Sequence, residues 1–176
     1  MKRLSVTAIR SSLRTAFPLP ALLAGYLLGL LFCFWEILSA PPSSPILLRP
    51  QTLWAAFADY TALELPFWIV CTLLGFFKLP ESAALPVLGR AILFGYGSLQ
   101  VYLSAGKGLL YFLYVLGNVL TLLPLCCVAK LAMKQSAICK RLTGNDPVRY
   151  LFRCLYYWGL TLIILFLRSS IGALIA

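Results

Sequence analysis

The chain has 176 residues, of which 61% are hydrophobic and 11% charged, and its mean hydropathy is +0.91. A soluble domain of this length could not solvate so apolar a surface. The composition therefore predicts an all-α polytopic membrane protein. The net charge is +10, but the basic residues flank apolar stretches, where each binds anionic lipid headgroups with about 1 kcal/mol. The expected contact is with membrane lipids, and a nucleic-acid partner is excluded.

Five apolar stretches predict a bundle of five transmembrane helices, because a spanning helix needs about 20 predominantly apolar residues. The expected spans are about 17–38, 63–77, 86–106, 108–129 and 150–167, within a single membrane domain that covers 1–176. The first apolar stretch is longer than the core of a cleaved signal peptide, about 7–15 residues, so it is expected to be a retained helix. Between the spans lie an outside segment at 41–62 and a cytoplasmic loop at 130–149.

The distribution of Lys and Arg predicts the orientation N-in and C-out. Short loops that carry these residues resist translocation. With the N-terminus inside, twelve of the fifteen basic residues fall on the cytoplasmic side and three outside. The inside group is Lys2, Arg3, Arg10, Arg14, Lys78, Arg90, Lys130, Lys134, Lys140, Arg141, Arg149 and Arg153, and the outside group is Arg49, Lys107 and Arg168.

Basic residues at the cytoplasmic ends are candidate membrane-surface anchors: Arg3, Arg10 and Arg14 near the N-terminus, and Arg149 and Arg153 at the inner end of the last span. Residues 1–16 place apolar side chains along one helical face, which suits a short interfacial helix. A flexible basic arm that only sets topology fits equally well.

The outside segment 41–62 begins with several prolines, which prevent a regular helix there. From Gln51 onward the pattern predicts a short amphipathic helix at the outer interface, with its aromatic residues at the level of the lipid headgroups. Trp54, Phe57 and Tyr60 are the candidate partner contacts. This segment is the only expected outside surface large enough to present a recognition site.

Spans three and four form a helical hairpin that turns at 106–108 and contains the most polar part of the membrane core. The residues expected to set its packing are Gly95, Gly97, Gln100, Asn118 and Pro124. A buried amide is costly in hydrocarbon unless it is paired. Gln100 and Asn118 are therefore predicted to bond to each other or to nearby backbone. Interhelical packing is favoured over a polar substrate path, which stays open as the alternative.

Reactive chemistry is sparse in this sequence. It contains no histidine and five acidic residues, all expected near the membrane surfaces: Glu36, Asp59, Glu64, Glu81 and Asp146. That placement argues against a carboxylate proton relay inside the membrane. It also argues against a His-dependent nucleophile and a bound metal. The sequence therefore predicts a protein that is not an enzyme and needs no cofactor.

The hairpin sequence LPVLGRAILFGYGSLQVYL, followed by YFLYVLGNVLTLLPLCCVAKLAM and by VRYLFRCLYYWG, resembles the stage II sporulation protein M family. Gly95, Gly97, the pair Asn118 and Pro124, and the Arg/aromatic entry to the last span follow the order of that family's core. The resemblance covers about 63–176. It implies a non-catalytic component of engulfment in a bacterial plasma membrane, assembled with the peptidoglycan-degrading sporulation proteins D and P.

Two functional hypotheses follow from the sequence. The first is a five-helix scaffold that localises wall hydrolases at the division septum during sporulation, and an oligomer of this chain is compatible with that role. The second is a small permease or the membrane subunit of a transporter, whose substrate would pass Gln100 and Asn118.

Overall fold

The computed structural model describes residues 18–39, 52–105, 108–141 and 146–175, and the regular structure in these ranges is helical throughout. The bounds are α2 Leu19–Ser39, α3 Leu53–Leu74, the short 3-10 helix η1 Pro80–Ala83, α4 Ala84–Ala105, α5 Leu109–Arg141 and α6 Pro147–Ile175. Each of the five α-helices is long and apolar enough to cross a membrane. The protein is therefore a multi-pass helical membrane protein, as the composition predicted.

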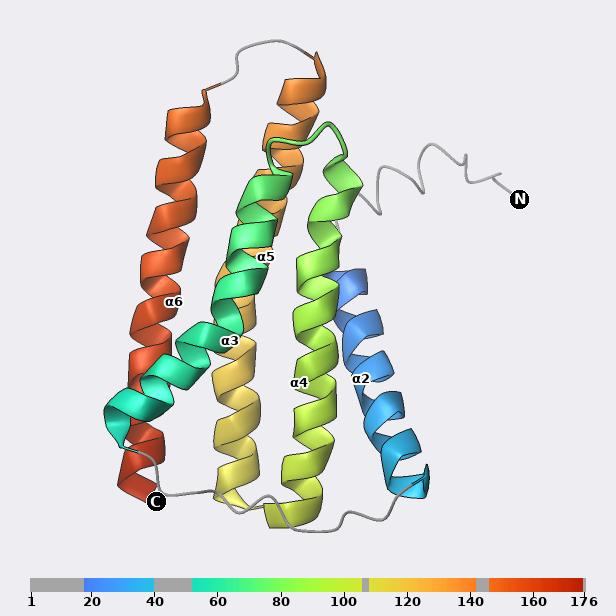
Figure 1. Cartoon of the computed structure of the whole chain (residues 1–176), viewed down its shortest axis with the longest axis vertical. Helices are drawn as coiled ribbons and strands as arrows, with labels where there is room; N and C mark the ends of the chain where they lie inside the picture. The colour runs from blue at the N-terminus through green and yellow to red at the C-terminus, as the bar shows by residue number, and fades with distance from the viewer. Residues whose placement is uncertain (1–17, 40–51, 106–107, 142–145, 176) are drawn as a thin grey trace, which may run out of the picture.

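Successive α-helices run in alternating directions along the long axis of the bundle (Figure 1). α5 and α6 are the longest, with 33 and 29 residues. At 1.5 Å per residue they measure about 50 and 44 Å, more than the hydrocarbon core of a bilayer. At one end of the bundle both extend past the other helices (Figure 1). The loop expected at 130–149 therefore begins as helix, as far as Arg141.

The apolar core lies between α3, α4, α5 and α6. Its buried residues include Trp68, Val87, Leu125, Val128 and Cys154. α2 stands at the edge of the bundle and packs mainly against α4 (Figure 1). The remaining faces of α2 are apolar and exposed, as expected for a helix in contact with lipid.

The close contact between α2 and α4 depends on glycine. A Cβ at Gly25 or Gly29 would overlap backbone atoms of α4, and a Cβ at Gly95 would overlap the backbone of Tyr26. Small residues on facing helices allow this approach, and packing is the main force that associates helices inside a bilayer. The Gly25/Gly29 spacing thus marks a real helix–helix contact. Gly95 faces α2, whereas Gly97 faces Tyr114 of the hairpin partner α5.

α3 differs from the prediction for this part of the chain. The structure has one continuous helix from Leu53 to Leu74, where the sequence suggested an interfacial helix followed by a span at 63–77. Thr52 caps its start, accepting a hydrogen bond from the backbone N–H of Ala55 at 3.3 Å. The helix changes direction part-way (Figure 1). It contains Pro66, which removes a backbone donor and is a common cause of such bends.

Some predicted features lie outside the described residues. They are the N-terminal segment 1–16 with Arg3, Arg10 and Arg14, the first part of the outside segment at 41–51, and the turn residues 106–107. Asp146 accepts a hydrogen bond from the backbone N–H of Arg149 at 3.0 Å and so caps the start of α6.

Candidate functional site: a buried charged cluster inside the bundle

Glu64 lies at the middle of α3, eleven residues after Leu53 and ten before Leu74. Its side chain is 1% exposed. With a rise of 1.5 Å per residue, it is roughly 15 Å from either end of the helix. A carboxylate at this depth is costly to bury unless a cation and hydrogen bonds compensate it. The surrounding helices supply that compensation.

Arg90 of α4 provides the counter-charge. Its Nη2 atom is 2.6 Å from Glu64 Oε1, and its Nε–H donates to the same oxygen at 2.7 Å. Nη2 also donates to Asn118 Oδ1 of α5 at 2.7 Å. Arg90 is 2% exposed, so one buried guanidinium connects three helices.

Arg168 of α6 brings a second guanidinium to the same place. Its Nη1 atom lies 3.5 Å from Asn118 Oδ1. Its Cζ atom lies 4.2 Å above the ring centroid of Tyr60 and 5.5 Å from that of Tyr114, which are cation–π distances. We call Glu64, Arg90, Asn118 and Arg168 the ionic cluster. It joins the four helices that also build the apolar core.

Asn118 is the shared acceptor of the ionic cluster. Its Oδ1 atom accepts from both arginines, and its Nδ2–H donates to the backbone carbonyl of Tyr114 at 2.8 Å. All polar atoms of this amide are therefore used. The prediction that Asn118 bonds to nearby backbone is confirmed, but a pair with Gln100 is not what the structure shows.

Gln100 belongs to a separate polar chain between α2 and α4. Its Nε2–H donates to Tyr96 Oη at 2.8 Å, and Tyr96 in turn donates to the Glu36 carboxylate. The two amides expected to form one hairpin contact thus have different partners. Gln100 points into the α2 side of the bundle and Asn118 into the four-helix core.

The ionic cluster carries an excess positive charge. Two guanidinium groups and one carboxylate give +1 if all three are ionised. Glu64 Oε2 and Trp68 Nε1, one helical turn apart on α3, are both buried and lack a hydrogen-bond partner among the described residues. An unbonded carboxylate oxygen one turn from an unbonded indole N–H, beside the Arg90 guanidinium, is an arrangement that can bind a small polar ligand.

The ionic cluster corrects the placement of three charged residues. Glu64 had been expected outside, so the prediction that no acidic residue lies within the membrane is wrong. Arg90 and Arg168 had been assigned to the inner and outer surfaces, but both point into the bundle. Removing Arg90 from the inside group and Arg168 from the outside group still leaves eleven against two. The charge bias does not depend on them.

The candidate partner contacts on α3 make contacts within the chain. The rings of Trp54 and Phe57 lie 6.1 and 6.0 Å from Phe166 of α6, measured between centroids. Tyr60 lies under Arg168. Trp54 nevertheless remains 68% exposed, and Phe57 is half-buried. This aromatic cluster, Trp54, Phe57 and Phe166, therefore joins α3 to α6 while it presents a surface.

The remaining predicted residues are all in helices. α5 continues through Pro124. Arg149 and Arg153 are exposed on the first turns of α6. Among the described residues, no group of three or more His, Cys, Asp or Glu side chains gathers closely enough to hold a metal ion.

Comparison with protein-family models, with curated proteins and with solved structures gave no match.

The sequence contains an indication of the ionic cluster that an average hydropathy does not reveal. Arg90 stands in the apolar run LPVLGRAILF, and Glu64 stands in LELPFWIV. An ionisable residue inside an apolar helical stretch is by default a candidate for a buried functional group.

Proposed function

We propose that this protein is a non-catalytic membrane scaffold of the bacterial plasma membrane that holds peptidoglycan hydrolases at the division septum during sporulation. The supporting observation is the ionic cluster. Its charged and amide groups bond mainly to one another across α3, α4, α5 and α6. Apolar helices gain little by associating in lipid, so buried polar contacts help to fix one arrangement. A fixed bundle is what a presenting platform requires.

The aromatic cluster is the proposed contact for the partner. Trp54 combines high exposure with a fixed place against α6, and exposed aromatic side chains are common centres of protein interfaces. In the N-in orientation, this cluster lies near the outer membrane surface, where the septal wall is degraded. The partners are expected to be the membrane-anchored sporulation hydrolases D and P, as the family resemblance implies.

The orientation is supported by the positions of the basic side chains. Lys78 follows α3, Lys130 and Lys134 lie on the second half of α5, and Arg149 and Arg153 lie at the start of α6. Because successive helices alternate in direction (Figure 1), these segments meet at one end of the bundle. That end is the cytoplasmic end by the positive-inside rule.

The test is crosslinking of sporulating cells, followed by affinity capture of the tagged full-length protein and identification of its partners by mass spectrometry. We expect the wall hydrolases to be recovered with the wild type and to be reduced severalfold with Trp54→Ala. Trp35→Ala is the matched control, because Trp35 of α2 is 72% exposed but lies outside the aromatic cluster. Equal capture by both variants would refute the proposed contact, and recovery of an ATPase or a solute-binding protein would refute the scaffold.

A second candidate function is a small permease or a transporter's membrane subunit. The observation in its favour is the buried Glu64 carboxylate, with one unbonded oxygen beside Arg90 and near Arg168. A transport path through the ionic cluster must admit water. In a Cys-free background, cysteines at positions 90 and 118 should then react with aqueous thiol reagents in intact cells. Lack of reaction at both positions would eliminate this candidate.

A further inference from the structure

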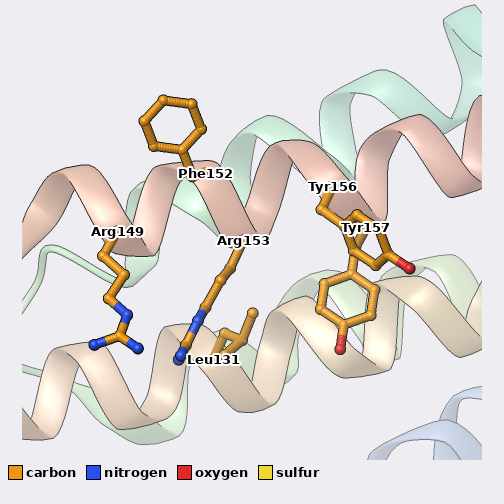
Figure 2. A pocket seen from close by; sticks show the side chains of 6 residues that line it. All are labelled: Leu131, Arg149, Phe152, Arg153, Tyr156 and Tyr157. Carbon is orange, nitrogen blue, oxygen red and sulfur yellow. The ribbon is translucent and has the colours of Figure 1, made fainter.

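A groove of about 370 Å³ lies between α5 and α6, near the end of the bundle where α6 begins. It is lined by Leu131 of α5 and by Arg149, Phe152, Arg153, Tyr156 and Tyr157 of α6 (Figure 2). The groove is on the surface, and most of its α6 residues are exposed. It is distinct from the ionic cluster, with which it shares no residue.

Two arginines form the polar end of the groove. Arg149 and Arg153 are four residues apart, so they share one face of α6. Figure 2 shows both side chains extending from α6 toward α5. Within the described residues neither guanidinium forms an ion pair. The carboxylate of Asp146 is engaged by the backbone N–H of Arg149. The two guanidinium groups are therefore available to an external anion.

The groove changes from charged to aromatic along α6. Tyr157 lies eight residues after Arg149, or about 12 Å along the helix axis. The headgroup layer of a bilayer is about 5–7 Å thick on each side, so this length reaches from the headgroups into the hydrocarbon. Tyrosines at the far end suit that boundary, because their rings are apolar and their hydroxyls are polar.

We propose that this groove binds one anionic glycerophospholipid, with its phosphate between Arg149 and Arg153 and an acyl chain against the aromatic part. Guanidinium groups bind phosphate oxygens with charge-assisted, often bidentate hydrogen bonds. A free phosphate would use only the arginines, whereas a phospholipid also covers the apolar lining. The site makes the two arginines a defined lipid contact and not a diffuse surface charge. This inference does not rest on the scaffold function.

The test is native mass spectrometry of the detergent-solubilised full-length protein with added phosphatidylglycerol or with phosphatidylcholine of the same acyl chains. The wild type should retain phosphatidylglycerol in preference to phosphatidylcholine. Each basic residue contributes about fivefold to binding, so Arg149→Gln/Arg153→Gln should weaken retention of phosphatidylglycerol roughly 30-fold. Thermal unfolding without lipid identifies a variant that has lost its fold.

The matched control is Lys78→Gln/Lys134→Gln, which removes the same charge from exposed positions that do not line the groove. This control should retain lipid within about twofold of the wild type. Equal losses in the two double variants would overturn the proposal in favour of diffuse attraction. Displacement of the lipid by millimolar inorganic phosphate would overturn it in favour of a free-anion site. If the arginine variant is unfolded, Tyr157→Ala is measured instead, and unchanged selectivity and affinity there would also overturn it.

Discussion

Replacing Glu64 with glutamine should destabilise this protein more than replacing either arginine of the ionic cluster with glutamine. Glu64→Gln keeps the shape of the side chain and one acceptor oxygen for Arg90, but it replaces the second oxygen with a donor and removes the only carboxylate of the cluster. Its acceptor oxygen lies 2.6–2.7 Å from Arg90, and both side chains are at most 2% exposed. The change therefore acts through charge at a dry site, with little loss of packing.

The magnitude follows from the charges that remain. The cluster carries +1 with two arginines and one carboxylate, +2 in Glu64→Gln, and zero in Arg90→Gln or Arg168→Gln. Removing one partner of a buried ion pair costs about 3–5 kcal/mol, because the other charge is left uncompensated. Arg90→Gln breaks the same pair but leaves the cluster neutral, with Arg168 still bonded to Asn118, so its loss should lie at the low end of that range. The free energy of unfolding should fall most in Glu64→Gln.

The decisive comparison is a double variant. Glu64→Gln/Arg168→Gln returns the cluster to +1 without restoring any contact of Glu64. If excess charge is the cause, the second substitution should recover about 1–3 kcal/mol of the loss, within the range of coupling between neighbouring sites. Contacts alone predict the opposite, a further loss, because Arg168 packs over Tyr60 and Tyr114.

The assay is reversible unfolding in mixed micelles with increasing SDS, followed by tryptophan fluorescence. Trp68 is 3% exposed, contacts Trp158 of α6 with tilted rings at a centroid distance of 5.1 Å, and lies one turn from Glu64. Its emission therefore reports separation of α3 from α6 close to the ionic cluster. The reasoning is refuted if Arg90→Gln lowers the free energy of unfolding as much as Glu64→Gln does. It is also refuted if the losses from Glu64→Gln and Arg168→Gln simply add in the double variant.

Three further predictions concern helix packing. Gly29→Ala should cost about 1–3 kcal/mol and loosen α2, because its Cβ would overlap a backbone oxygen of α4. The control is Gly159→Ala, whose new methyl has nothing within 4 Å and which should be neutral or stabilising in the same unfolding assay. Equal losses of stability in Gly29→Ala and Gly159→Ala would contradict the packing argument. Gly97→Leu should lower the protein level in membranes, because a Cβ there overlaps a tyrosine hydroxyl of α5; intact level and partner capture would show the hairpin tolerates bulk. Tyr150→Phe removes the hydroxyl that donates to an α3 carbonyl at 2.8 Å, so the free energy of unfolding should fall by about 1 kcal/mol. An unchanged unfolding midpoint would count against that hydrogen bond.

The residues of the ionic cluster could be recognised from the sequence only one at a time. Arg90 lies six residues after the start of α4, and Arg168 seven before the end of α6. Either depth is compatible with a side chain that reaches toward the surface. Glu64 fell near the start of the expected span because the preceding Asp59, Tyr60 and Thr61 lower the local hydropathy. The helix begins earlier because Thr52 caps it, and this moves Glu64 to its middle.

The number of membrane helices and their all-α class were determined by the sequence alone. Hydropathy and length are local properties, and a bilayer forces any sufficiently long apolar segment to satisfy its backbone as a helix. Which side chains meet is not local. Glu64, Arg90, Asn118 and Arg168 come from four helices, and their meeting depends on how each helix is rotated and shifted against the others. Only the tertiary structure decides this, because a small rotation would have turned the same charges toward lipid.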